Sequence, residues 1–278
     1  MTTIKNAAQM AAILGILGLE LCSNLTVLAQ TPQDIINSIM NKIPQKWEKR
    51  FIPPKNIGVP RHRQGGGTRG PGGGNGRESL AFCLPNQGKI ALLVPPSGFG
   101  TTVSNTPRFF WYMPNNSANK LRFVVSDKNE NDIYTQTLDK VKGKSGIMSA
   151  QLPQHIKLKN GETYNWYIEL ICATDEELLY DESGLIVIKG TFQITSKNEI
   201  VKKINNNTDK TTKLANYADA GLWYDTVNTL VELKQQYPKD AQISLAWQKL
   251  LKSADLEKFY QASLVHSGNA NITSKPQP

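Results

Sequence analysis

The 278-residue chain is poor in the side chains on which most metal sites and nucleophilic enzymes depend, with only three cysteines and three histidines. The histidines, His62, His155 and His266, are isolated, and no pair has the i, i+4 spacing of a helical metal site. The sequence also lacks the Gly-x-Ser-x-Gly elbow of a serine hydrolase and the Gly-Lys-Ser/Thr end of a phosphate-binding loop. We therefore expect no metal, no cofactor and no enzymatic activity.

Long apolar runs are missing as well. The N-terminal apolar stretch, residues 11–19, is far shorter than the roughly 20 residues that a membrane-spanning helix needs. Val27 and Ala29 follow it at the −3 and −1 positions of a signal-peptidase site. We predict a signal peptide over residues 1–29, no membrane span, and a periplasmic or extracellular protein after cleavage near Ala29. A buried N-terminal helix and lipid attachment at Cys22 are the alternatives.

Two cysteines remain after that cleavage, Cys83 and Cys172. An even pair in an oxidising compartment predicts a disulfide between them. Two inert buried thiols are the alternative. A catalytic thiol is disfavoured because neither cysteine stands in a recognisable nucleophile motif.

Acidic residues are absent from one segment, and this absence explains much of the net charge of +9. Residues 53–77 hold five cations and no acid, and eight of the twelve residues 65–76 are glycine. Such a composition predicts a flexible Gly/Arg-rich linker. Its alternative role is attraction to an anionic envelope polymer. We expect no nucleic-acid partner, because a signal peptide precedes the arginines.

Residues 78–196 consist of short runs of strand-forming residues separated by turn residues, a pattern that is typical of β structure. Residues 163–172 alternate most clearly and place Tyr164, Trp166 and Cys172 on one face. Seven short runs at this spacing predict an immunoglobulin-like antiparallel β-sandwich. The runs are residues 89–94, 108–113, 121–126, 132–138, 147–152, 163–172 and 185–195.

Helical periods flank this β region. Residues 30–52 predict a short amphipathic helix that Pro44 stops or kinks. Residues 197–266 predict a helical domain, and residues 267–278 predict a disordered polar tail.

Within the helical domain, Tyr217, Gly221 and Pro238 have the spacing of a tetratricopeptide-like helical hairpin. The small alanines of that motif are replaced by larger residues, so the match is partial. A third helix over residues 241–260 can close the bundle.

Two aromatic clusters hold the candidate contact residues, Phe110 and Tyr112 on one strand and Trp223 and Tyr224 on a helix. They are candidate partner contacts, although we favour internal packing between the helices and the sandwich. The acidic residues 175–182 lack the pattern of a calcium loop, which favours a solvated loop.

Four segments together resemble the cyanobacterial Domain of Unknown Function 928 (DUF928) family. They are IALLVP at residues 90–95, TVSNTPRFFWYMP at 102–114, YNWYIELIC at 164–172 and YADAGLWYDTVNTLVEL at 217–233. The resemblance covers roughly residues 60–258. It implies a cyanobacterial envelope protein with a Gly/Arg-rich segment, a β-rich domain and a helical C-terminus, and it implies no catalytic residues.

These observations favour a non-enzymatic exported envelope protein that acts as a binding or scaffold module, with an envelope protein or anionic envelope polymer as partner. The alternative is a cell-envelope glycan hydrolase that uses a carboxylate pair, since such pairs come together only in the fold.

Overall fold

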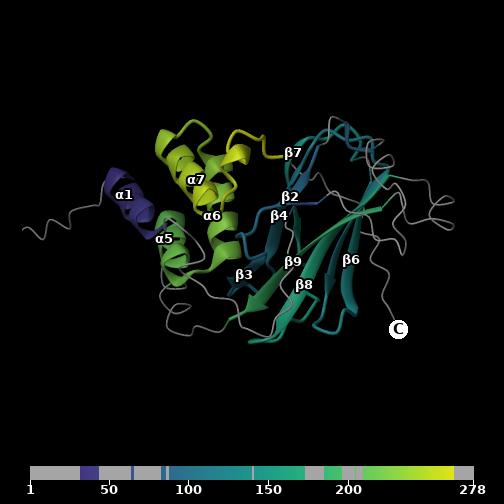
Figure 1. Cartoon of the computed structure of the whole chain (residues 1–278). Helices are drawn as coiled ribbons and strands as arrows, with labels where there is room; N and C mark the ends of the chain where they lie inside the picture. The colour runs from purple at the N-terminus through teal and green to yellow at the C-terminus, as the bar shows by residue number, and fades with distance from the viewer. Residues whose placement is uncertain are drawn as a thin grey trace, which may run out of the picture. The chain divides into compact units, whose positions relative to one another are not determined.

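The computed structural model (Figure 1) describes residues 32–43, 64–65, 83–85, 88–139, 141–172, 185–195, 204 and 209–265. The predicted signal peptide, most of the Gly/Arg-rich linker, the acidic loop and the C-terminal tail lie outside the described residues. Residues 32–278 belong to one compact unit. In the described part of the chain, no helix has the length and apolar character needed to cross a membrane.

The described residues form nine strands in two sheets. The first sheet is antiparallel throughout and has the order β1–β2–β4–β7, with β1 (Gln64–Gly65), β2 (Ile90–Leu92), β4 (Arg108–Met113) and β7 (Gly146–Gln151). The second has the order β3–β9–β8–β5–β6, with β3 (Phe99–Thr102), β5 (Lys120–Ser126), β6 (Asp132–Asp139), β8 (Thr163–Ile171) and β9 (Leu185–Ile194). In the second sheet β3 runs parallel to β9, and all other neighbouring strands are antiparallel. The prediction of a purely antiparallel β region is therefore wrong at β3.

All seven runs predicted as strands are strands in the structure, within about two residues at each end. The alternation predicted for β8 is confirmed, because Tyr164 and Trp166 are buried while Asn165 and Tyr167 are partly exposed. Strands β1 and β3 were missed. The two residues of β1 lie in the predicted Gly/Arg-rich linker, where they pair with β2. Strand β3 is the longer of the two. All four of its residues are buried, so it has no alternation, and it directly follows the turn at Gly98.

The two sheets meet through aromatic side chains. The ring centroid of Phe109 on β4 lies 5.3 Å from Phe123, 5.0 Å from Trp166 and 4.9 Å from Phe192, three rings of the second sheet. Trp111, also on β4, is parallel to Phe123 at 6.5 Å. Alternate residues of β4 therefore point at the second sheet, as its period of two requires.

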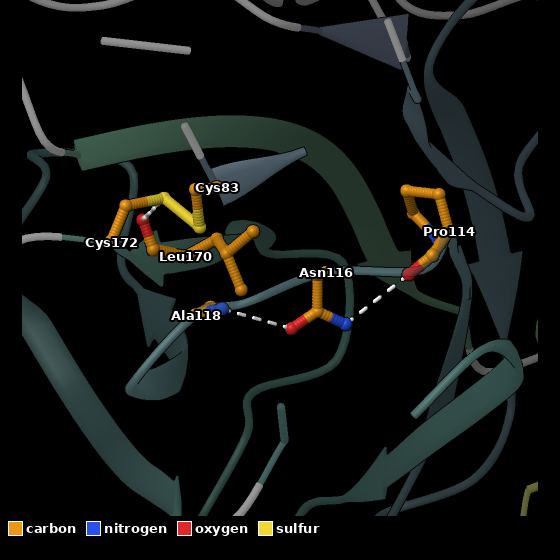
Figure 2. Close-up of a disulfide and its surroundings, with 6 residues drawn as sticks. All are labelled: Cys83, Pro114, Asn116, Ala118, Leu170 and Cys172. Atoms are coloured by element: carbon orange, nitrogen blue, oxygen red, sulfur yellow. Dashed lines mark hydrogen bonds between the residues drawn. A yellow bond between two sulfur atoms is a disulfide. The ribbon is translucent and has the colours of Figure 1, made fainter. Parts of the chain in front are cut away.

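The disulfide predicted between Cys83 and Cys172 is present, with 5.4 Å between the Cα atoms (Figure 2). It ties the segment before β2 to the end of β8. Close by, the buried Asn116 holds a tight loop: its Nδ2 donates to the carbonyl of Pro114 at 3.2 Å, and its Oδ1 accepts from the N–H of Ala118 at 3.2 Å. Together these bonds fix the loop between β4 and β5.

A helical region follows the sheets, and the chain is mainly β with this helical C-terminus. Its elements are α5 (Lys210–Ala220), α6 (Trp223–Gln236), α7 (Ala241–Ser253) and the short 3-10 helix η4 (Glu257–Phe259). The N-terminal helix α1 (Pro32–Lys42) packs on α5 and α7 and buries Ile39 and Ile43. The predicted turn at Gly221 is confirmed: its φ of 74° ends α5 in the left-handed region that glycine favours.

The helix predicted over residues 241–260 is wrong beyond Ser253. Asp255 has a φ of 52°, and the N–H of Leu256 returns to the carbonyl of Leu251 at 2.8 Å. This reversal buries Leu256 completely and brings the ring of Phe259 against Tyr112, with 4.5 Å between centroids. Burial of these two apolar side chains explains why the helix ends early.

Candidate binding cleft

The start of helix α6 is anchored in the sheets. The hydroxyl of Thr101 on β3 donates to the carbonyl of Gly221 at 2.9 Å, in the turn before α6. The indole Nε1 of Trp223 donates to the carbonyl of Leu93 at 2.8 Å, and Trp223 is fully buried. Thr101 lies on β3 of the second sheet, and Leu93 directly follows β2 of the first sheet. These two bonds therefore fix the first turn of α6 against both sheets.

Tyr224 continues this anchor into the core. Its Oη accepts from Nε1 of Trp166 at 2.9 Å and donates to the carbonyl of Thr191 at 3.3 Å. Burial raises the pKa of its phenol far above the ordinary value, so the hydroxyl stays protonated. Gly100 makes room for the ring, because a Cβ at that position would lie 2.9 Å from Cε2 of Tyr224.

The structure places all four candidate contact residues against the chain itself. Phe110, Trp223 and Tyr224 are at most 3% exposed, and the partly exposed Tyr112 stacks on Phe259. Internal packing, the interpretation that we favoured, is therefore what the structure shows within the chain. Contact of these residues with a partner stays a prediction.

Next to the anchor lies a cleft of about 290 Å³, which we name the α6 cleft. One wall is formed by helices α5 and α6, and the other by the loop after β3 and the start of β4. Its described lining residues are Thr102, Val103, Ser104, Thr106, Pro107, Arg108, Gln151, Ile204, Tyr217, Tyr224, Asp225, Asn228 and Thr229.

Asp225 is the buried acid of the α6 cleft, with 8% of its surface exposed. Burial raises the pKa of its carboxyl to about 7, although hydrogen bonds from the Thr102 hydroxyl and the N–H groups of Val103 and Ser104 oppose this change. The bond from Val103 is 3.1 Å long. Near neutral pH the carboxyl therefore exists in both protonation states and can accept or donate a hydrogen bond.

A polar stripe on α6 extends the cleft from Asp225. Asn228, Thr229 and Glu232 follow it at i+3, i+4 and i+7, the spacing of one helix face. The Thr229 hydroxyl donates to the carbonyl of Asp225 at 2.8 Å, and Nδ2 of Asn228 donates to Oε1 of Glu232 at 3.0 Å. The Oδ1 of Asn228 is buried and has no hydrogen-bond partner among the described residues. A buried acceptor of this kind is costly unless a donor reaches it.

Tyr217 of α5 lines the same cleft. Burial, together with the negative charge of the nearby Asp225 and Glu232, raises the pKa of its phenol to about 12. The phenol is therefore a hydrogen-bond donor at any physiological pH.

The opposite wall carries the positive charge of the α6 cleft. Nη2 of Arg108 donates to Oε1 of Gln151 at 2.8 Å, and Nε2 of Gln151 donates to the carbonyl of Thr106 at 3.3 Å. Among the described lining residues, Arg108 and Asp225 are the one base and the one acid. The cleft thus offers donors and acceptors in balance rather than a strong charge of either sign.

A second hollow of about 530 Å³ lies among the loops at residues 127–129 and 155–164. It contains His155, but its charged side chains are open to solvent: Lys128 and Glu162 are 65% and 43% exposed and lie 3.7 Å apart. Such a pair is weak and screened by salt. In the described part of the chain, no three His, Cys, Asp or Glu side chains gather as metal ligands.

Sequence reasoning missed the α6 cleft because it weighed Trp223 and Tyr224 and passed over their neighbours. The missed residues are Asp225, Asn228 and Thr229, which are polar at helical spacing on a helix whose other buried positions are mostly apolar. Arg108 was noticed only as the start of a strand. Nothing in its sequence position indicates that it faces a helix more than 100 residues away.

The chain was compared with known proteins. The family model described as Domain of Unknown Function (DUF928) matches residues 64–264, which include both sheets, α5 to α7 and the whole described lining of the α6 cleft. No curated protein matches the chain.

Proposed function

Because the chain belongs to the DUF928 family, which is defined as a domain of unknown function, we propose a function from the α6 cleft. The protein is a non-enzymatic exported envelope protein that acts as a binding module, and the α6 cleft holds its ligand. The observation that carries this proposal is the buried Asp225 beside the unpartnered Oδ1 of Asn228. Polar groups buried at the floor of a cleft orient ligands in most small-molecule sites.

The lining favours a neutral, hydroxyl-rich ligand the size of one sugar ring. The cleft volume of about 290 Å³ lies just below the range of about 300–1,000 Å³ that is usual for small-molecule pockets, which favours a small ligand. The acid and the base balance each other, so an ionic ligand of either sign gains little. Sugar hydroxyls both donate and accept, which matches Tyr217, Asn228 and the carboxyl of Asp225.

Compartment and finer architecture belong to the same proposal. The N-terminal 29 residues act as a signal peptide, and the Cys83–Cys172 disulfide is consistent with an oxidising, cyanobacterial envelope compartment. The aromatic contacts between the sheets support an immunoglobulin-like sandwich. The turn at Gly221 and the end of α6 before Pro238 support a tetratricopeptide-like hairpin.

The test is ligand-observed NMR with a neutral hexose oligosaccharide, the matching uronate and the matching amine. We expect the neutral sugar to bind and the Asn228→Ala variant to bind it at least about tenfold more weakly, a change of about 1.4 kcal/mol. Glu162→Gln, in the second hollow, is the control and should bind as the wild type does. Binding of none of the three probes, or equal binding by Asn228→Ala, contradicts the α6 cleft as the site.

The alternative function is the glycan hydrolase. Hydrolysis by a carboxylate pair needs two acids roughly 5 to 10 Å apart, whereas the described lining of the α6 cleft contains only Asp225. The next acid on the same helix face, Glu232, is already bound by Asn228 and by Lys210, at 3.0 and 2.9 Å. These observations favour binding without turnover. Release of reducing ends from envelope polysaccharide by the wild type, lost in Asp225→Asn, would favour the hydrolase instead.

A further inference from the structure

Three of the four sheet edges in the described structure are short or covered. Strand β1 has two residues. The edge of β7 is paired by the C-terminal segment, since Ile147 donates to the carbonyl of Ser263 and accepts from the N–H of Val265, both at 2.8 Å. Helix α6 contacts β3 through the Thr101–Gly221 hydrogen bond. Covering or shortening an edge prevents its free N–H and C=O groups from pairing with another chain.

Among the residues that the structure describes, nothing covers the edge of strand β6 in this way. It is the last strand of its sheet, eight residues long, and is labelled beside β8 in Figure 1. Within the described structure, its backbone forms hydrogen bonds only with β5. The strand contains no Lys or Pro, the residues that usually block an edge. A bulge opposite Val125 and Ser126 disturbs only its beginning, and pairing is regular from Tyr134 to Asp139.

The side chains of this regular part repeat in mirror order around Gln136. Thr135 and Thr137 flank it, and Tyr134 and Leu138 come next on either side. The cross-strand register places Tyr134, Gln136 and Leu138 opposite the buried Val125, Phe123 and Leu121, so these three share the inward face. The two threonines therefore share the outer face.

We infer that β6 is a self-association edge, on which a second copy of this chain adds its own β6 in antiparallel order about a twofold axis at Gln136. In this register Thr135 lies opposite Thr137 of the second copy, Tyr134 opposite Leu138, and Gln136 opposite Gln136. Each of these three pairs joins side chains of like polarity, which suits an isologous interface. Thr–Thr and aromatic–aliphatic pairs stabilise neighbouring antiparallel strands.

The mirror order is the reason for choosing a second copy over an unrelated peptide. An unrelated peptide would need only the free backbone N–H and C=O groups of β6. Its binding would not require the side chains of β6 to have a mirror order around Gln136. The two acids of β6 also allow self-pairing, because Asp139 then lies opposite Ile133 and not opposite another acid. The inference stands apart from the α6 cleft and does not depend on its ligand.

The test is sedimentation velocity of the wild-type chain over a concentration series, with two matched variants. Thr135→Lys/Thr137→Lys places lysine opposite lysine twice across the axis, whereas Thr135→Lys/Thr137→Glu places lysine opposite glutamate twice. Both variants change the same two partly exposed positions. We expect a wild-type dimer, a monomeric Lys/Lys variant whose affinity falls at least tenfold, and a Lys/Glu variant that dimerises as well as the wild type or better. Circular dichroism of both variants checks that they are folded.

Three results overturn the inference. A wild-type chain that stays monomeric at every concentration shows that the edge does not associate. Dimers of equal affinity in all three proteins place the interface elsewhere. Loss of the dimer in both folded variants contradicts the pairing of Thr135 with Thr137 and with it the twofold axis at Gln136.

Discussion

Trp166 on β8 and Tyr224 on α6 are joined by a buried hydrogen bond, 2.9 Å from the indole Nε1 to the phenol Oη. The same phenol donates to the carbonyl of Thr191 on β9. One hydroxyl therefore satisfies two polar groups of the second sheet from a helix that follows it in the chain. In this way the helical region becomes part of the core of the sheets.

Removal of that hydroxyl should destabilise the fold. We expect Tyr224→Phe to lower the free energy of unfolding by about 1–3 kcal/mol, because the indole N–H of Trp166 is left buried without an acceptor. Urea denaturation measures the change. Tyr112→Phe removes a hydroxyl from a partly exposed ring and should cost less. Equal losses in the two variants would contradict the role assigned to the bond.

Gly100 should be required for the packing of α6 on β3. We expect Gly100→Ala to cost about 1–3 kcal/mol, because its Cβ would lie 2.9 Å from the ring of Tyr224 and 3.1 Å from Cβ of Trp223. Thermal unfolding measures the loss. Gly143→Asn is the control, since that site is open and asparagine tolerates its φ of 75°. An unchanged Tm in Gly100→Ala would show that α6 has room to move.

The disulfide should contribute strongly to stability. Cys83 and Cys172 are 89 residues apart, so their bond closes a long loop in the unfolded chain. We expect the double variant Cys83→Ala/Cys172→Ala to lose about 2–5 kcal/mol in urea denaturation. Reduction of the wild type should reproduce that loss, and reduction of the double variant should change nothing. A wild type that is unaffected by reductant would contradict the prediction.

Asp225 should make stability depend on pH in a predictable direction. Its pKa is about 7 in the folded protein and near the ordinary 3.8 when unfolded, so the folded state holds the extra proton between these values. The resulting stabilisation is complete below pH 3.8 and is lost as the pH rises through about 7. The slope reaches at most about 1.4 kcal/mol per pH unit. Urea denaturation from pH 4 to pH 8 measures it.

The Asp225→Asn variant should remove this slope, because an amide does not titrate. Asp209→Asn is the control. Burial raises the pKa of Asp209, but hydrogen bonds from Thr211 and Thr212 outweigh it and hold the pKa below its ordinary value. Its stabilisation is therefore lost only as the pH falls below 3.8, outside the measured range. A slope that persists in Asp225→Asn would contradict the assignment.

The C-terminal segment should protect the edge of β7. Truncation after Ala262 removes the bonds that Ser263 and Val265 make with Ile147, whereas truncation after Val265 keeps them. We expect the shorter chain to aggregate on heating and the longer one to stay in solution, since a free edge pairs with other chains. Light scattering at increasing temperature measures the difference. Equal aggregation of the two chains would show that this edge needs no cover.

The sequence predicted the strands well because each of the seven is bounded by turn residues and carries a period of two or a short apolar run. The disulfide was predicted from the even number of cysteines left after the predicted cleavage and from the predicted oxidising compartment. Strand β3 and the end of α7 were not predicted, because long-range burial determines both. Strand β3 lies between α6 and β9, Leu256 is fully buried, and Phe259 stacks on Tyr112 of the first sheet.

The site was predicted less well than the fold. Trp223 and Tyr224 could be recognised in the sequence because they are aromatic. The hydrogen bonds of the Asp225 carboxyl come from Val103 and Ser104, residues more than 100 positions away. Burial alone raises the pKa of that carboxyl, and burial is a property of the packed helix and loop. No local pattern around Asp225 contains this information.

The anchor of α6 also affects the order in which the chain can fold as it is made. Both sheets are complete in sequence at Ile194, yet the rings that close their core, Trp223 and Tyr224, are synthesised later. A nascent chain that ends before them leaves the indole of Trp166 without its partner and the rings around Phe109 without their cover. The native core can therefore be completed only once Trp223 and Tyr224 are present, after all the strands of both sheets have been synthesised.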